Sequence, residues 1–343
     1  MKHNMQILQE AAEKNGPLCV GLDTDPSYLP SSVLANFATP AQAVLAYNKE
    51  LIKSVERTKS ACCFKVQIAY YEAMGLEGLE VYKKTLDLIK QSGIPVISDI
   101  KRGDIAATAG AYAKAHFSGD FETDIITINP YTGFDTLKPF AKYCAPATSA
   151  LAASSAGSAG ATSELAASTL GSAASGSIDG VTTSGSKGIF VLLRTSNPGM
   201  VDIEQQELKL GGRVLDCVGT ELNRLNEEWK KTYPEQTCSP IGAVVGCTEE
   251  SDAKALRTAY PELFFLIPGY GAQGGDARIA ATLLQKAGGT VNSSRGILCA
   301  WKKDAEFEKA REEGTLCLAD ITQAAEKACL IAKDDLLKAK NNL

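Results

Sequence analysis

Short runs of consecutive apolar residues recur along the chain, and each is followed by a longer segment with helical periodicity. Seven runs are distinct and an eighth is weaker, at 18–23, 61–67, 94–100, 124–130, 188–195, 241–246, 263–269 and 289–292. The runs lack alternation between apolar and polar residues. Both faces of each predicted strand should therefore be buried, as in a parallel sheet covered by helices.

The segments between these runs carry helix start and stop signals. Thr39 and Pro40 open one segment as the predicted N-cap and first helical residue, and Gly93 closes the next as a glycine cap. Segments 211–229, 251–260 and 276–289 follow the same pattern. Eight strand–helix units predict one α/β domain over residues 1–343, a TIM (β/α)8 barrel. An open doubly wound sheet is the structural alternative.

Residues 145–187 interrupt this alternation. They are almost entirely Ala, Ser, Gly and Thr, with few large apolar side chains. Such a segment cannot bury enough surface to offset the entropy lost on ordering. We predict a flexible, low-complexity surface insertion between the fourth helix and the fifth strand.

Charge and composition narrow the class of protein. The chain has 343 residues and a formal net charge of -5, which argues against general nucleic-acid binding. Neither an N-terminal signal segment nor an apolar run of about 18 residues is evident, so we expect a cytoplasmic protein without membrane contact, its ten cysteines reduced. With His3 and His116 as the only histidines, acid–base chemistry must come from Lys, Asp or Glu.

Charged residues gather at the predicted strand ends, where barrel enzymes place their active sites. Asp23 follows the first strand, Lys65 lies in the second, and Asp99, Lys101 and Asp104 come at the end of the third. Asp99 and Lys101 are two residues apart, so on a strand both would point to one side. A structural salt bridge would account for two of these charges, but not for four near a buried strand end.

The spacing Asp99-x-Lys101-x-x-Asp104-Ile105 resembles the signature of the orotidine 5'-monophosphate decarboxylases. FKVQ around Lys65 is similar to the family's second-strand lysine motif, and the segments TSNPG and PGYGAQGG resemble its longer, type 2-like subgroup. The resemblance spans nearly the whole chain except the insertion. It implies conversion of orotidine 5'-monophosphate to UMP in pyrimidine synthesis. It also implies a homodimer with shared active sites, and neither a metal ion nor an organic cofactor.

The resemblance also implies a catalytic tetrad: Lys65, Asp99, Lys101 and Asp104. Lys101 would protonate C6 of the pyrimidine as carbon dioxide leaves, and Asp99 would lie beside the departing carboxylate. Asp104 would reach into the site from the other subunit. A positively charged group at this place suits a reaction whose substrate has no electron sink of its own.

The remaining residues implied by the resemblance would bind the substrate: Asp23, Ile105, Thr108, Thr195, Ser196, Pro268, Gln273 and Arg295. Ile105 and Thr108 would come with Asp104 from the other subunit. Asp23 and the second-strand lysine would hold the ribose hydroxyls, and Thr195 and Ser196 the pyrimidine edge. Gln273 and Arg295 would bind the phosphate beside a glycine-rich loop, whose G-x-G-x-x-G spelling occurs too late in the chain for a dinucleotide site.

Two other functions are compatible with parts of this pattern. A magnesium-dependent sugar-phosphate decarboxylase or aldolase of the same superfamily would keep the Asp-x-Lys-x-x-Asp frame but need a metal ion. A catalytically silent nucleotide-binding or scaffold protein would need no complete tetrad, so the presence of all four charges argues against it.

Overall fold

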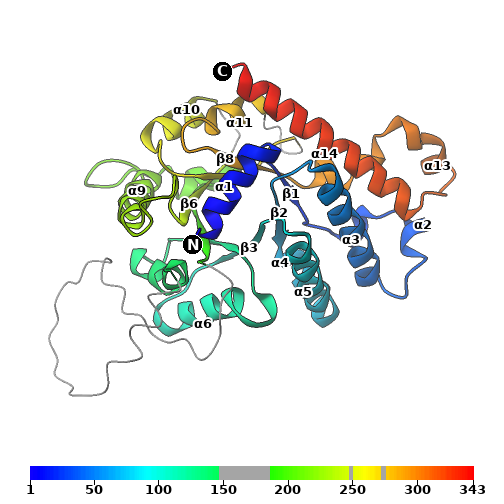
Figure 1. Ribbon diagram of the computed structural model, residues 1–343, viewed down its shortest axis with the longest axis horizontal. Coiled ribbons are helices and arrows are strands. Elements are labelled where there is room, and N and C mark those ends of the chain that lie inside the picture. The colour runs from blue at the N-terminus through cyan, green and yellow to red at the C-terminus, as the bar shows by residue number, and fades with distance from the viewer. Residues whose placement is uncertain (147–185, 247–249, 272–275) are drawn as a thin grey trace.

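The computed structural model describes residues 1–146, 186–246, 250–271 and 276–343 (Figure 1). Eight parallel strands form a closed barrel in chain order, with β1 paired to both β2 and β8. The strands are β1 Leu18–Gly21, β2 Cys63–Gln67, β3 Val96–Arg102, β4 Ile125–Ile128, β5 Gly188–Arg194, β6 Ile241–Val245, β7 Phe265–Ile267 and β8 Gly289–Ser293. All eight predicted strands, the weak eighth included, are therefore present. The predicted TIM barrel is confirmed, and the open sheet is wrong.

Helices surround the barrel (Figure 1). Those of ten or more residues are α1 Asn4–Asn15, α3 Pro40–Thr58, α5 Gly75–Ser92, α6 Ala106–Phe117, α9 Val214–Thr232, α10 Glu250–Ala259 and α14 Leu318–Asn341. Shorter ones are α2 Ser31–Leu34, α4 Ile68–Glu72, α7 Lys138–Ala141, α11 Ala277–Leu283, α12 Arg295–Leu298 and α13 Glu308–Glu312. The predicted caps are confirmed: the Thr39 hydroxyl accepts from the backbone N–H of Gln42, and Gly93 is left-handed with φ of 69°.

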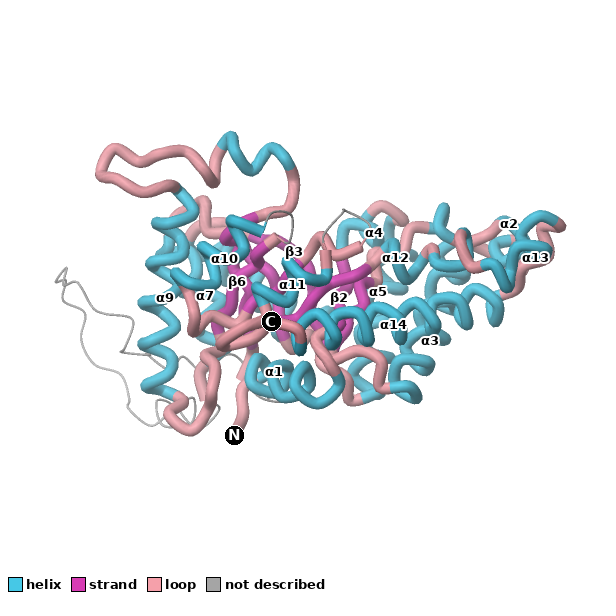
Figure 2. Tube along the Cα trace, turned by 90° about the horizontal axis from the view of Figure 1, so that it is seen from above, coloured by secondary structure: helices cyan, strands magenta, loops and turns pink. Residues whose placement is uncertain are grey.

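Helix α1 closes the end of the barrel at which the strands begin, and it lies beneath them in Figure 2. The backbone N–H of Asn4 donates to the carbonyl of Ser186 just before β5, at 2.9 Å. Met5 and Leu8 of this helix are fully buried and belong to an apolar cluster inside the barrel. That cluster continues to Leu192, Val244 and Leu266, which lie near the opposite end of the barrel.

The predicted insertion at 145–187 lies outside the described residues except at its ends. Its last two residues, Ser186 and Lys187, are buried, and the Lys187 ammonium pairs with Glu122 at 2.8 Å. The prediction was therefore wrong for these two residues, because they lead directly into β5.

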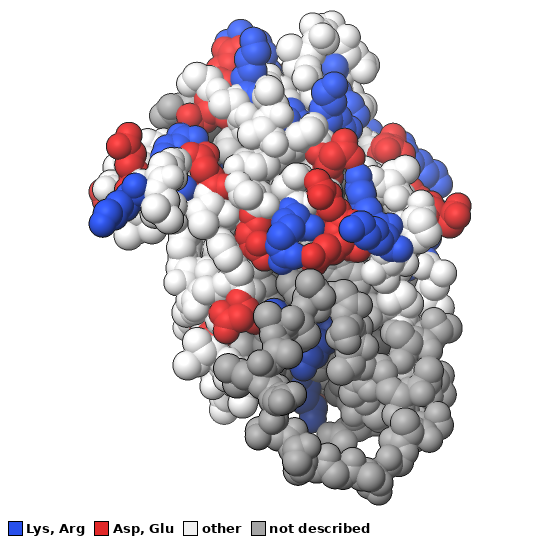
Figure 3. All heavy atoms as spheres, turned by 90° about the vertical axis from the view of Figure 1, so that its left-hand side faces the viewer, with Lys and Arg blue, Asp and Glu red and all other residues white. Residues whose placement is uncertain are grey.

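On the face around α9, acidic and basic side chains are interspersed (Figure 3). Within the described part of the chain, no helix is long and apolar enough to span a bilayer.

Candidate active site

A cavity of about 620 Å³ opens at the carboxyl ends of the strands, the end opposite to α1. Eight of the predicted site residues line it: Asp23, Lys65, Asp99, Lys101, Thr195, Ser196, Pro268 and Arg295. Gln273 lies outside the described residues, so the structure does not place it. The cavity thus brings together side chains from strands that are far apart in the sequence, as the barrel prediction requires.

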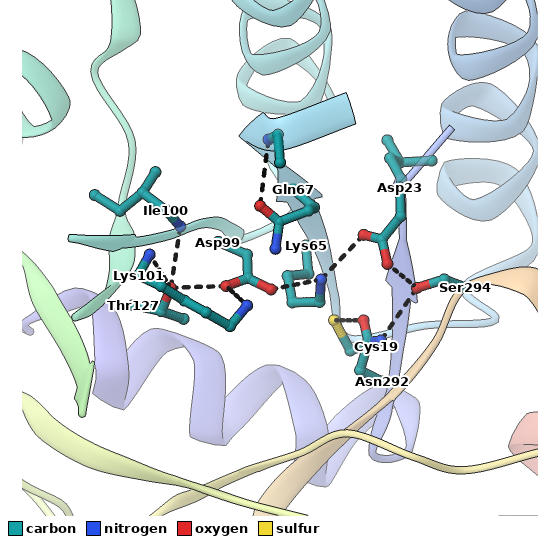
Figure 4. Close-up of polar contacts among 12 residues, drawn as sticks. Cys19, Asp23, Lys65, Gln67, Asp99, Ile100, Lys101, Thr127, Asn292 and Ser294 are labelled. Carbon is teal, nitrogen blue, oxygen red and sulfur yellow. Dashed lines mark hydrogen bonds and ion pairs between the residues drawn. The ribbon is translucent and has the colours of Figure 1, made fainter. Parts of the chain in front are cut away.

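Four charged side chains form a continuous row along one wall of this cavity (Figure 4). The Lys65 ammonium lies 3.0 Å from Asp23 Oδ1 and 2.9 Å from Asp99 Oδ2. Lys101 Nζ lies 2.6 Å from the other oxygen of Asp99. Each lysine therefore contacts Asp99, and carboxylates and ammonium groups alternate along the row.

The alternating charges shift the pKa values of Lys65 and Asp99 in opposite directions, in both cases against the effect of burial. Burial alone would lower the pKa of Lys65, but the Asp23 and Asp99 carboxylates outweigh that effect and raise it. Burial alone would likewise raise the pKa of Asp99, but Lys65 and Lys101 hold it well below its usual range. Lys65 and Asp99 are consequently charged at neutral pH although both are nearly inaccessible to solvent.

Asp23 is oriented by a residue that sequence reasoning passed over. The Ser294 hydroxyl donates to Asp23 Oδ2 at 2.8 Å, and Asn292 Nδ2 donates to the Ser294 oxygen at 3.2 Å. A Cβ atom at Gly21 would stand 2.0 Å from Ser294 Oγ, so only glycine fits there. Asn292, Ser293 and Ser294 spell a glycosylation sequon, but Asn292 is only 8% exposed at the end of β8, so the folded chain does not present it for modification.

The segment after β5 is fixed by a buried carboxylate, Glu204. Its oxygens accept from the Thr195 backbone N–H at 2.9 Å, the Thr195 hydroxyl at 2.8 Å and the Tyr131 hydroxyl at 3.1 Å. Thr195 is thereby engaged within the protein, and Ser196 beside it lines the cavity. Ser196 packs so closely on Gly246 that a Cβ there would lie 2.9 Å from its Cα. No local sequence pattern marked Glu204.

The predicted residues Asp104, Ile105 and Thr108 are not among those that line the cavity of the single chain. The Asp104 carboxylate accepts from the backbone N–H of Ile105 at 2.8 Å. Ile105 is 61% exposed although it is apolar. The structure therefore does not bring these three together with the charged row.

Beyond the predicted site residues, further polar and aromatic residues line the cavity: Tyr28, Gln67, Tyr70, Thr127, Asn197, Tyr270 and Asn292. The Tyr28 and Tyr70 rings lie 6.5 Å apart. The Tyr270 hydroxyl donates to Asp335 of α14 at 2.6 Å, which ties the rim of the cavity to the C-terminal helix. In the described ranges, no group of three or more His, Cys, Asp or Glu side chains could hold a metal ion.

Neither histidine lies in the cavity. The His3 ring is buried against Tyr233, and the His116 ring is buried against Phe121. Burial lowers the pKa of each to about 4, so both are neutral near pH 7. The expectation that acid–base chemistry falls to lysines and carboxylates agrees with this placement.

Comparison with known proteins identifies the family. The sequence model of the "Orotidine 5'-phosphate decarboxylase / HUMPS family" matches residues 16–310. The chain is 43% identical to an orotidine 5'-phosphate decarboxylase of Clostridium novyi (strain NT), over 89% of this chain and 92% of that protein. It is 45% identical to the protein of that name from Clostridium perfringens (strain 13 / Type A), over 93% and 98%.

A solved structure agrees with these sequence matches. The structure of Leishmania donovani OMP decarboxylase superposes with a TM-score of 0.63 at 25% identity, covering 99% of both chains. The matches extend across the barrel and across every strand that contributes to the charged row. The chain therefore belongs to the orotidine 5'-phosphate decarboxylase / HUMPS family.

Proposed function

We propose that this chain is an orotidine 5'-phosphate decarboxylase, which converts orotidine 5'-monophosphate to UMP and carbon dioxide in de novo pyrimidine biosynthesis. The observation that carries the proposal is the row Asp23–Lys65–Asp99–Lys101 along the cavity wall. The family name includes a second branch, HUMPS, beside the decarboxylases. Both Clostridium relatives carry the decarboxylase name. These relatives favour the nucleotide substrate over a sugar phosphate.

Lys101 supplies the proton in this mechanism. The bond between C6 and the carboxylate breaks, carbon dioxide leaves, and the electron pair stays on C6. A fixed ammonium group stabilises this charge and then transfers a proton from Nζ to C6. The neutral amine that remains takes up a proton from solvent. Asp99, held between two lysines, places a negative charge beside the substrate carboxylate and keeps Lys101 in position.

We further propose a homodimer in which Asp104, Ile105 and Thr108 complete the partner's site. Ile105 is exposed, as are the apolar side chains Tyr131, Val201 and Ile203 of the loops after β4 and β5. Burial of such side chains against a second copy would stabilise an interface next to the cavity.

We also propose a cytoplasmic location. The nine described cysteines are all free thiols, and a reducing compartment such as the cytoplasm keeps cysteines in that state.

The assay that tests the function is ultraviolet loss of orotidine 5'-monophosphate by the purified protein in excess EDTA. We expect conversion to UMP at the same rate with and without the chelator, because lysines and carboxylates carry every step. Activity that vanishes in EDTA and returns with magnesium would instead support the metal-dependent alternative. UMP binding without any turnover would support the silent nucleotide-binding protein.

A second prediction concerns Arg295, which we expect to bind the phosphate of the substrate. It is the first residue of α12 and lines the cavity next to Ser294. A guanidinium binds two phosphate oxygens at once, so Arg295→Ala should raise the KM for orotidine 5'-monophosphate about 10- to 100-fold. Affinity for uridine, which lacks the phosphate, should stay unchanged.

Steady-state kinetics and uridine titration provide the two measurements. Arg224→Ala is the matched control, because Arg224 pairs with Glu221 on α9 and does not line the cavity. Equal weakening of nucleotide and nucleoside binding in Arg295→Ala would refute the phosphate assignment.

A further inference from the structure

The pairing of β3 with β4 is interrupted where the charged residues lie. Register is lost between Ser98 and Arg102, so residues 99–101 of β3 together face Thr127 alone on β4. Within this bulge Lys101 has φ of 46°, in the left-handed region that residues with a side chain rarely adopt. A strained backbone at this point persists only if its surroundings hold it.

The side chain of Thr127 makes the hydrogen bonds that the bulge leaves open (Figure 4). Its Oγ1 accepts from the backbone N–H groups of Ile100 and Lys101, both at 3.0 Å, and donates to Asp99 Oδ1 at 2.8 Å. A hydroxyl has one donor and two acceptor positions, so its entire capacity is used. Thr127 is 1% exposed, so water cannot take over these bonds.

A second anchor holds the other side of the same residue, at its carbonyl. Asn129 Nδ2 donates to the Lys101 carbonyl at 3.1 Å. A Cβ atom at Gly103 would stand 2.5 Å from that nitrogen, so the glycine makes room for the contact. Lys101 is thus held at both its N–H and its carbonyl, and its ammonium meets the Asp99 oxygen that also accepts from Thr127.

We propose that Thr127 is the positioning residue for the proton donor: its one hydroxyl fixes both the bulge that carries Lys101 and the carboxylate that orients it. The proposal rests on the proposed function, in which Lys101 protonates C6. Thr127 lines the cavity, but its hydroxyl is fully engaged within the protein, so it acts through Asp99 and Lys101. Preorganisation of this kind affects the chemical step rather than the binding of the nucleotide.

Thr127→Val tests this directly, because it removes the hydroxyl at nearly constant shape. We expect kcat to fall about 10- to 100-fold. A loss of this size is expected when buried hydrogen bonds that position the reacting groups in the transition state are removed. The Kd for UMP should change less than about threefold, since no direct contact is lost. Thr127→Ser, which keeps the hydroxyl, should restore kcat to within about threefold of the wild-type value.

The matched control is Thr123→Val, a buried threonine just before β4 whose hydroxyl donates to the Val96 carbonyl. It should leave kcat unchanged. A folded Thr127→Val enzyme with normal kcat, or a Thr127→Ser enzyme as slow as Thr127→Val, would overturn the proposal. Weakened UMP binding at unaltered kcat would do the same. If Thr127→Val does not fold, Thr127→Ser against Thr127→Ala gives the same comparison.

Amide hydrogen exchange separates this proposal from the function itself. Exchange at Ile100 and Lys101 should be faster in Thr127→Val than in the wild-type chain or in Thr127→Ser, because those amides lose their acceptor. Unchanged exchange would contradict the positioning role. A wild-type chain that leaves orotidine 5'-monophosphate intact would refute the function, while the exchange comparison would still decide whether Thr127 holds the bulge.

Discussion

Lys101→Ala should lower kcat about 10⁴-fold or more, because it removes both the charge that stabilises the carbanion and the proton that quenches it. UMP should still bind, since Asp23, Lys65 and Arg295 remain in the cavity. The fold should also persist, because Asp99 keeps its ion pair with Lys65 at 2.9 Å. Single-turnover kinetics, UMP titration and thermal unfolding measure the three quantities.

Lys286→Ala is an apt control for that experiment. Lys286 is also a lysine with a left-handed backbone, φ of 60°, but it is exposed and does not line the cavity. It therefore imposes the same change of side chain on the same backbone conformation without touching the charged row. A near-normal rate for Lys101→Ala would remove Lys101 from the role of proton donor.

Mixing two inactive chains should restore activity. If Asp104 acts in the partner's site, a dimer of one Lys101→Ala and one Asp104→Ala chain contains one site with both groups intact. Random exchange makes about half of the dimers mixed, each with one working site of two, so about a quarter of wild-type activity should return. The measurement is decarboxylation before and after subunit exchange of an equimolar mixture.

A second mixture controls for unspecific stabilisation. Lys101 and Asp99 contact each other within one chain at 2.6 Å, so Lys101→Ala and Asp99→Ala chains cannot complement each other. No activity should return in that mixture. If subunit exchange is shown independently and the first mixture stays inactive, the shared site is refuted. Rescue in both mixtures would show that complementation does not depend on which residues share a site.

The sequence predicted those parts of the site that depend on local pattern. Apolar runs located the strands, and the strand ends located Asp23, Lys65, Asp99 and Lys101. The two-residue spacing of Asp99 and Lys101 predicted that they point the same way, and they do meet. They meet across a bulge in β3 rather than along a regular strand, however, and a spacing rule cannot reveal a bulge, which depends on the pairing with the neighbouring strand.

The residues that orient the charged row and Thr195 escaped prediction because no local motif marks their contacts. Ser294 reaches Asp23 from the residue after the last strand, and Glu204 fixes Thr195 from a loop without a motif. Thr127 did leave one signal, because it is the one polar residue in the four-residue strand β4. A buried polar side chain needs a partner, so such an interruption marks a residue worth pursuing. Asp104 does not line the cavity of the single chain, so its part in a site shared between two chains stays a prediction.

The apolar cluster beneath the cavity bears on how the protein can be trimmed or fused. Met5 and Leu8 of α1 belong to the same cluster as Leu192, Val244 and Leu266, which line the cavity. Yet α1 precedes residues 16–310, the part that the family match covers, and α14 follows it. A fragment cut to those bounds would keep every charged residue of the row. It would lose the apolar contacts that Met5 and Leu8 make inside the barrel. For protein engineering, the boundaries of a fragment should therefore follow the packed cluster, with α1 included, rather than the bounds of the family match.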